Sequence, residues 1–191
     1  MTTITVVKKG GRIAIAADTL TKWGGGKESA DYVANHEKII RVGDSYVAIT
    51  GSATFKLILA DYFASLDEPP ALDSVGAIFR VWNTLHGALK DHYYLQIGED
   101  KDEDLESSRM DVLIANPRGI FGVAAHRTVQ EFSRFYAYGS GSPYALGAMY
   151  AAFRAPSLDA EAVARLGVIA AAEFHDESGL PAQSFVIDAE E

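Results

Sequence analysis

The 191-residue chain contains no cysteine, and this absence excludes a whole group of sites. Without cysteine the protein has no disulfide, no zinc–thiolate centre and no thiol nucleophile. The chain has five histidines, and their spacing is not typical of metal ligands. We therefore expect no metal and no cofactor.

Basic residues are fewer than acidic residues. The chain has 17 lysines and arginines against 26 acidic residues, which gives a formal net charge of -9. A surface of this sign repels phosphate backbones and anionic headgroups, so we expect no binding to nucleic acid or to a membrane surface. Part of the excess lies in Glu99–Glu106, which we interpret as a solvated loop, with docking of a basic partner as the alternative.

Long apolar runs are missing as well. No segment approaches the roughly 20 apolar residues that span a bilayer. The start of the chain also lacks the charged and then apolar pattern of a signal peptide. We therefore expect a cytoplasmic protein. With 48% hydrophobic residues, its length suits one core, and we expect a single domain over residues 1–191.

The order of the expected elements indicates the fold class. β-rich stretches predict strands at Thr3–Lys8, Arg12–Asp18, Lys38–Val42, Ser45–Thr50, Met110–Asn116, Ile120–Ala124, Val129–Tyr138 and Gln183–Asp188. Apolar residues at helical spacing predict helices at Ala53–Leu66, Ser74–Tyr94, Pro143–Phe153 and Ala160–Phe174. Paired helices between antiparallel hairpins favour an α+β, four-layer αββα sandwich, with two antiparallel sheets between the helix pairs.

The start Met1-Thr2-Thr3 offers an unusual nucleophile. Removal of an initiator methionine is favoured before a small residue, and it would give Thr2 a free amine beside its hydroxyl. A hydroxyl is a poor nucleophile until a base accepts its proton, and α-amines titrate at about 7.7–8.0. We therefore predict that Thr2 is the nucleophile and that its own amine is the base.

Later residues supply what such a nucleophile needs. Asp18 ends the strand that pairs with the first one, and Lys38 opens the next hairpin. An Asp18–Lys38 pair would orient the lysine, whose charge lowers the pKa of a nearby amine. Gly51 follows a strand and suits a backbone donor to the oxyanion. Gly139-Ser140-Gly141-Ser142-Pro143 joins a strand to a helix and could bring the Ser140 hydroxyl to the amine.

These segments resemble those of proteasome β-subunits and the heat-shock-locus V peptidase. The resemblance covers nearly the whole chain, and it is strongest to the small bacterial proteasome homologues, whose start needs only removal of a methionine. It implies the Ntn-hydrolase fold and a threonine-type endopeptidase that cleaves polypeptides. It also assigns roles, with Thr2 as nucleophile, Asp18 and Lys38 as supporting pair, Gly51 as oxyanion donor and Ser140 in the proton relay.

One part of the chain departs from the family. Proteasome β-subunits carry Asp-x-x-Ser-Gly after the last long helix, and the matching stretch here is His175-Asp176-Glu177-Ser178-Gly179. Ser178 matches, whereas His175 stands in the register of the aspartate. Either a small shift lets Asp176 serve beside Ser178, or the outer relay is rewired.

The resemblance also places a substrate pocket and an assembly. Family pocket positions fall on Thr21, His36, Ile40, Ile49 and Ala53, which suggests a medium-sized apolar pocket. The family forms homo-oligomeric stacked rings with the threonines inside, so we expect hexameric or heptameric rings, arranged as a double ring. An ATP-dependent unfoldase is the expected partner.

Two alternatives from other classes remain. A non-catalytic structural ring subunit would keep the fold without the chemistry, and an Ntn amidase would act on a small amide without a ring. Considered alone, each feature has an ordinary interpretation: Asp18 as a turn residue, Lys38 as a surface lysine and the Gly-Ser-Gly-Ser segment as a linker. Their joint order favours the peptidase, and a solution mass separates it from a monomeric amidase.

Overall fold

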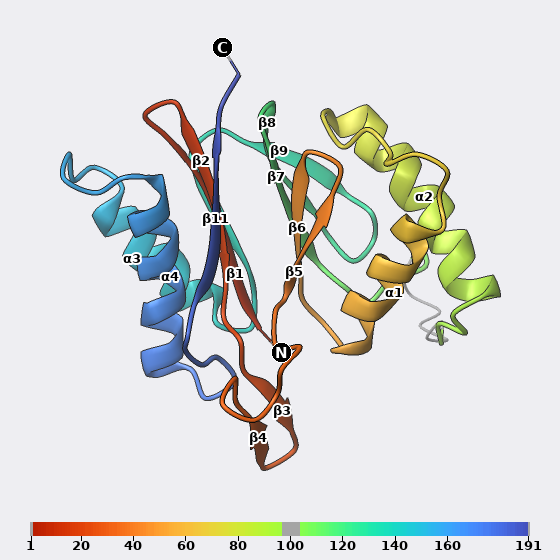
Figure 1. Ribbon diagram of the computed structural model, residues 1–191, viewed down its shortest axis with the longest axis horizontal. Helices are drawn as coiled ribbons and strands as arrows, with labels where there is room; N and C mark the ends of the chain where they lie inside the picture. Colours follow the sequence, from red (N-terminus) through yellow and green to blue (C-terminus); the bar gives the residue numbers. More distant parts are fainter. Residues whose placement is uncertain (1, 97–103, 191) are drawn as a thin grey trace.

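The computed structural model describes residues 2–96 and 104–190 and arranges them in four layers (Figure 1). Two sheets face each other in the middle. Helices α1 (Thr54–Ala64) and α2 (Val75–Asp91) cover one of them, and α3 (Ser142–Ala152) and α4 (Ala160–Phe174) cover the other. This arrangement confirms the αββα sandwich predicted from the sequence. Of the predicted acidic loop, residues 99–103 lie outside the described part.

Both sheets are antiparallel throughout. The first has the order β10-β1-β2-β11 and consists of β10 (Phe135–Gly139), β1 (Thr3–Lys9), β2 (Arg12–Ala17) and β11 (Gln183–Asp188). The second has the order β5-β6-β7-β8-β9 and consists of β5 (Ile39–Val42), β6 (Ser45–Ile49), β7 (Val112–Asn116), β8 (Gly119–Val123) and β9 (Val129–Phe132). A separate hairpin joins β3 (Thr21–Trp23) to β4 (Gly26–Glu28).

Strand alternation explains why the sheets stack. In β2, Ile13 and Ile15 face the second sheet, whereas Ala14 and Ala16 face the helix layer of α3 and α4. Both faces are buried, which is why this strand has an almost continuous apolar sequence. The small alanines let α4 lie close to the sheet, where Thr5 Oγ1 donates a hydrogen bond of 3.0 Å to the Ala164 carbonyl.

The structure corrects the predicted strand Val129–Tyr138. This run is two strands in two different sheets, because β9 pairs with β8 and β10 pairs with β1. The chain crosses between the sheets at the exposed residues Ser133 and Arg134. The sequence pattern hides the break, since aromatic residues continue on both sides of it.

No helix in the described part of the chain combines the length and the apolar character needed for crossing a membrane. Apolar residues on each helix instead pack into the core clusters against the sheets.

Candidate active site

Thr2 and Asp18 meet because two adjacent strands end together. Thr2 stands just before β1 and Asp18 just after β2, and the two strands pair in antiparallel register. The Asp18 amide donates to the Thr3 carbonyl at 3.0 Å, and the Thr3 amide donates to Asp18 Oδ1 at 2.9 Å. The hairpin therefore fixes the Asp18 side chain directly beneath the start of the chain.

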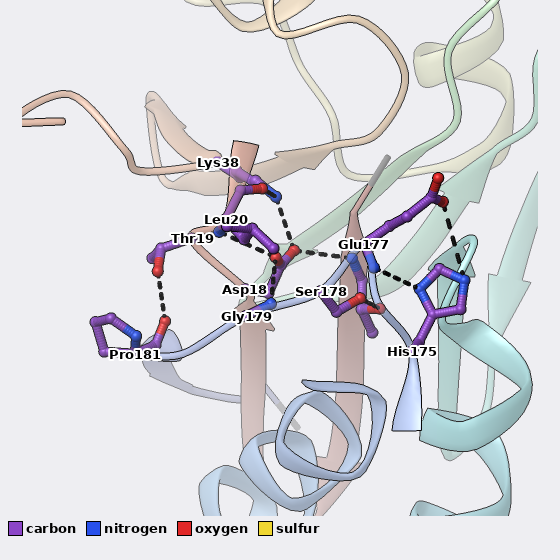
Figure 2. A network of polar contacts seen from close by, with 10 residues as sticks. Asp18, Thr19, Leu20, Lys38, His175, Glu177, Ser178, Gly179 and Pro181 are labelled. Carbon is purple, nitrogen blue, oxygen red and sulfur yellow. Dashed lines mark hydrogen bonds and ion pairs between the residues drawn. The ribbon is translucent and has the colours of Figure 1, made fainter. Parts of the chain in front are cut away.

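The Asp18 carboxylate has a partner in every direction (Figure 2). Its Oδ1 accepts from the Thr3 amide at 2.9 Å and from Lys38 Nζ at 2.8 Å. Its Oδ2 accepts from the Leu20 and Gly179 amides, both at 3.1 Å. A carboxylate offers about four lone-pair sites, and all are used here. These hydrogen bonds offset the free energy of desolvating the Asp18 carboxylate, which is 0% exposed.

Lys38 approaches Asp18 from the second sheet, immediately before β5. Its Nζ also donates to the Leu20 carbonyl at 2.6 Å, and its side chain is 11% exposed. The pKa of Lys38 is lowered overall. Burial is the main cause and the charge of Lys56 adds to it, whereas the nearby Asp18 carboxylate acts in the opposite direction. The predicted Asp18–Lys38 pair is thus present as a buried ion pair that bridges the two sheets.

Two glycines let backbone segments approach the site closely. Gly51 has φ +100°, and a Cβ there would lie 2.9 Å from the Arg109 carbonyl oxygen. Gly139 has φ +96°, and a Cβ there would lie 1.9 Å from the Thr2 carbonyl oxygen. Both backbone conformations strongly favour glycine. Ser140, the next residue, is exposed at the turn between β10 and α3.

Ser178 reaches the site through Thr3, a residue that the sequence analysis did not single out. Thr3 Oγ1 and Ser178 Oγ lie 2.7 Å apart, and both residues are buried. Gly141 leaves room for this contact, because a Cβ there would lie 2.2 Å from Thr3 Oγ1 and 2.9 Å from Ser178 Oγ. The second threonine at the start of the chain was the available signal for this contact.

Asp176 lies elsewhere. Its carboxylate pairs with Lys22 at 2.5 Å, with 72% of its side chain exposed. The neighbouring His175 turns toward Glu177, whose amide donates to His175 Nδ1 at 3.4 Å (Figure 2). The structure therefore brings Ser178 to the cluster and leaves Asp176 on the surface, where it ties the 175–179 turn to strand β3.

A cleft of about 330 Å³ opens beside Thr2. Four of the five predicted pocket residues line it, namely Thr21, His36, Ile49 and Ala53. Ile40 is not among the lining residues, because it packs into the core cluster beneath α1 and α2.

Charged side chains make the cleft more polar than expected. Lys38 and Lys56 line it together with Glu28 and Glu37. Burial lowers the pKa of Lys56, and the charge of Glu37 raises it. The predicted medium-sized apolar pocket therefore has charges on its walls.

A second, more open hollow adjoins the cleft at Thr2. It is lined by Thr2, Gly51, Asp111, Ser140 and Ser142, among others. Thr2 and Gly51 line both cavities, and Thr2 is only 3% exposed. The nucleophile candidate therefore lies at the floor where two cavities meet. Over residues 2–96 and 104–190, no group of acidic and histidine side chains is arranged to hold a metal ion.

The chain was compared with known proteins. No protein-family model and no curated sequence matched it. It is similar to the structure "Thiobacillus denitrificans BPH", with 87% identity, a TM-score of 0.95 and coverage of 98% of each chain. It is equally similar to "Thiobacillus denitrificans BPH in complex with Epoxomicin", with 87% identity, a TM-score of 0.95 and coverage of 99% and 100%.

A more distant structure shares the fold. It is the eukaryotic HslV from Trypanosoma brucei, with 18% identity, a TM-score of 0.69 and coverage of 97% of this chain and 99% of that chain. The likeness to HslV shows the fold, and the 87% identity shows the family. The chain belongs to the family of the bacterial proteasome homologue (BPH) of Thiobacillus denitrificans.

Proposed function

We propose that the protein is a threonine-type endopeptidase whose nucleophile is Thr2, freed by removal of Met1. The buried Asp18–Lys38 pair is the observation that carries this proposal, because it holds a cation in the cleft that Thr2 lines. A protein with 87% identity has been solved in complex with the protease inhibitor epoxomicin, which supports the same chemistry in this chain.

The proposed reaction begins at the Thr2 hydroxyl. The free α-amine of Thr2 accepts the hydroxyl proton while Oγ attacks the carbonyl carbon of the peptide. The oxyanion of the tetrahedral intermediate accepts a hydrogen bond from the Gly51 amide. Collapse of the intermediate breaks the C–N bond, and the leaving amine takes the proton from the Thr2 amine. Water then attacks the ester and restores the hydroxyl.

Removal of Met1 is essential to this scheme. While Met1 is attached, the Thr2 nitrogen belongs to an amide, and an amide nitrogen has no basic lone pair. Once the amine is free, the positive charge of Lys38 lowers its pKa and increases the fraction of free base near neutral pH. Ser140 shares the hollow with Thr2 and is the proposed hydroxyl that passes the proton.

The proposal extends to substrate and assembly. Thr21, His36, Ile49 and Ala53 would contact the residue on the acyl side of the cleaved bond, in a cleft that also presents charged groups. We further propose that the chain is one domain that assembles into homo-oligomeric stacked rings, with polypeptides as substrates and an ATP-dependent unfoldase as partner.

Hydrolysis of a fluorogenic peptide library, together with the intact mass of the protein, tests the function. We expect loss of Met1 and peptide cleavage that disappears in Thr2→Ala. Thr84→Ala is the matched control, because Thr84 loses the same atoms on the exposed face of α2.

The solution mass of the same sample tests the assembly. A fully processed protein that forms rings and cleaves no peptide would indicate a structural subunit. A processed monomer that hydrolyses only small amides would indicate an Ntn amidase.

A further inference from the structure

A polar clasp lies on the outer side of the second sheet, away from Asp18 and Lys38. His86 on α2 is 7% exposed, and both of its ring nitrogens are engaged. Nδ1 lies 2.9 Å from Ser108 Oγ, and Nε2 lies 3.0 Å from Glu106 Oε2. An ionised carboxylate only accepts hydrogen bonds, so Nε2 carries a proton. His86 thus joins α2 to the segment that precedes β7.

Glu106 is held from further directions. Lys90 Nζ donates to both of its carboxylate oxygens, at 2.9 and 2.8 Å. Arg127, in the turn between β8 and β9, donates from Nη1 to the Glu106 carbonyl at 2.6 Å. Hydrogen bonds from Lys90 and His86 lower the pKa of Glu106. Helix α2 and the β8–β9 turn therefore both grip the chain at Glu106.

The segment that Glu106 and Ser108 anchor continues into Arg109, which contacts Gly51. The Ser108 amide donates to the Ala125 carbonyl at 2.6 Å, and Arg109 adopts φ +55°. The Arg109 carbonyl oxygen then packs so closely on Gly51 that a Cβ there would lie 2.9 Å away. The following Asp111 carbonyl accepts from the Thr50 amide at 2.9 Å and from Thr50 Oγ1 at 3.1 Å. Residues 109–111 thus form a wall against which Thr50 and Gly51 rest.

We propose that Glu106 and His86 are positioning residues that set the direction of the Gly51 amide through the Arg109–Asp111 wall. The inference rests on the proposed role of Gly51 as the oxyanion donor. Such a donor must lie about 2.7–3.1 Å from the oxyanion. A movement of residues 109–111 by a fraction of an ångström would displace the Gly51 amide, and it would reduce the stabilisation of the transition state more than the affinity for substrate.

The variant Glu106→Gln tests this inference, with Glu190→Gln as the matched control. Glu190 undergoes the same change of charge and is similarly exposed. Its partner is Arg118, so the change does not touch the contacts of Glu106. We expect kcat for a peptide to fall about 10-fold in Glu106→Gln while KM stays unchanged. The control should keep both constants. Lys90→Met removes part of the grip on an exposed carboxylate without altering a buried group, and it should give a smaller loss in the same direction.

A pair of inhibitors separates positioning of the amide from general damage. A peptide aldehyde forms a hemiacetal with Thr2, whose oxygen occupies the oxyanion site, whereas the matching peptide alcohol binds without one. Glu106→Gln should raise the inhibition constant of the aldehyde about 10-fold and leave that of the alcohol and the melting temperature unchanged.

Equal effects on both inhibitors, or wild-type kinetics in Glu106→Gln and Lys90→Met, would overturn the inference. If the wild-type protein neither cleaved peptides nor bound the aldehyde, the proposed function itself would fail.

Discussion

On one side of Thr2 the fully buried carboxylate of Asp18 is bound by four donors, whereas on the other side Ser140 stands exposed at an open hollow. The first side joins both sheets and the 175–179 turn, so its geometry is set when the protein folds. The second side is the turn between β10 and α3, where Ser140 is exposed beside the hollow. Substitutions on the buried side should therefore change stability and activity together, and those on the open side should change activity alone.

The largest effect is expected from Asp18→Asn. The substitution leaves the buried Lys38 ammonium without its counter-charge and turns an amide NH₂ toward backbone donors. Breaking a buried pair from one side costs about 3–5 kcal/mol, so the melting temperature should fall and peptide cleavage should disappear. Chemical denaturation measures the loss. A stability equal to that of the wild type would show that the Asp18 side is not the rigid half of the site.

Gly139→Ala should give the next largest effect. The new Cβ would collide with the Thr2 carbonyl, and its positive φ adds strain, which together cost about 2–4 kcal/mol. Gly147→Ala is the matched control, because a Cβ at Gly147 in α3 meets nothing within 4 Å. We expect the control to be at least as stable as the wild type. Equal melting temperatures for the two variants would contradict the close approach at Thr2.

Ser140→Ala should separate the two sides most clearly. Loss of a hydroxyl that passes a proton lowers kcat by about 100-fold, at the low end of the usual contribution of proton transfer. Because Ser140 is exposed, the free energy of unfolding should change by less than about 0.5 kcal/mol. Ser142→Ala, in the same hollow, serves as the control for kcat. A drop in stability without a drop in kcat would reverse the comparison.

The pH dependence of kcat sharpens the description of the buried side. Lys38 must keep its proton to lower the pKa of the Thr2 amine, so activity should fall at alkaline pH as Lys38 loses it. The charge of Lys56 lowers the pKa of Lys38, and removing that charge raises it. Lys56→Met should therefore move the alkaline limb to higher pH, whereas Lys27→Met, an exposed lysine on β4, should not. A shift to lower pH in Lys56→Met would contradict this assignment.

The smallest effect is expected at the edge of the site, from Asp176→Asn. The Asp176 carboxylate is 72% exposed, and solvent screens its ion pair with Lys22, so we expect little change in stability. Its place on the surface predicts a kcat within about twofold of the wild type. A loss of kcat comparable to that of Ser140→Ala would instead place Asp176 in the proton relay, as the family motif suggests.

The parts of the site that depend on strand ends could be predicted from the sequence. Asp18 follows β2 and Lys38 precedes β5, and both strands belong to hairpins that local sequence predicts. The two residues then meet because the two sheets stack face to face. The placement of Asp176 could not be predicted in this way, because the 175–179 turn is anchored by backbone contacts at Gly179 and by Lys22. Sequence spacing contains neither contact.

Two further placements depend on tertiary structure. Ile40 lies on β5, where it packs against the core cluster under α1 and α2, and it is not among the residues that line the cleft. Val129–Tyr138 has a continuous pattern, yet its two halves pair with β8 and β1 in different sheets. β9 pairs with the neighbouring β8, whereas β10 joins the sheet of β1, a partner far away in sequence, and local alternation does not encode that choice.

The site of epoxomicin attachment, located by intact mass and peptide mapping in the wild type and in Lys38→Met, tests directly whether the buried ion pair activates Thr2. We expect the wild-type protein to lose Met1 and to gain one adduct on the Thr2 peptide. We expect Lys38→Met to lose Met1 equally and to form the adduct far more slowly. An adduct on another residue, or an unchanged rate without Lys38, would contradict Thr2 activated by the buried ion pair.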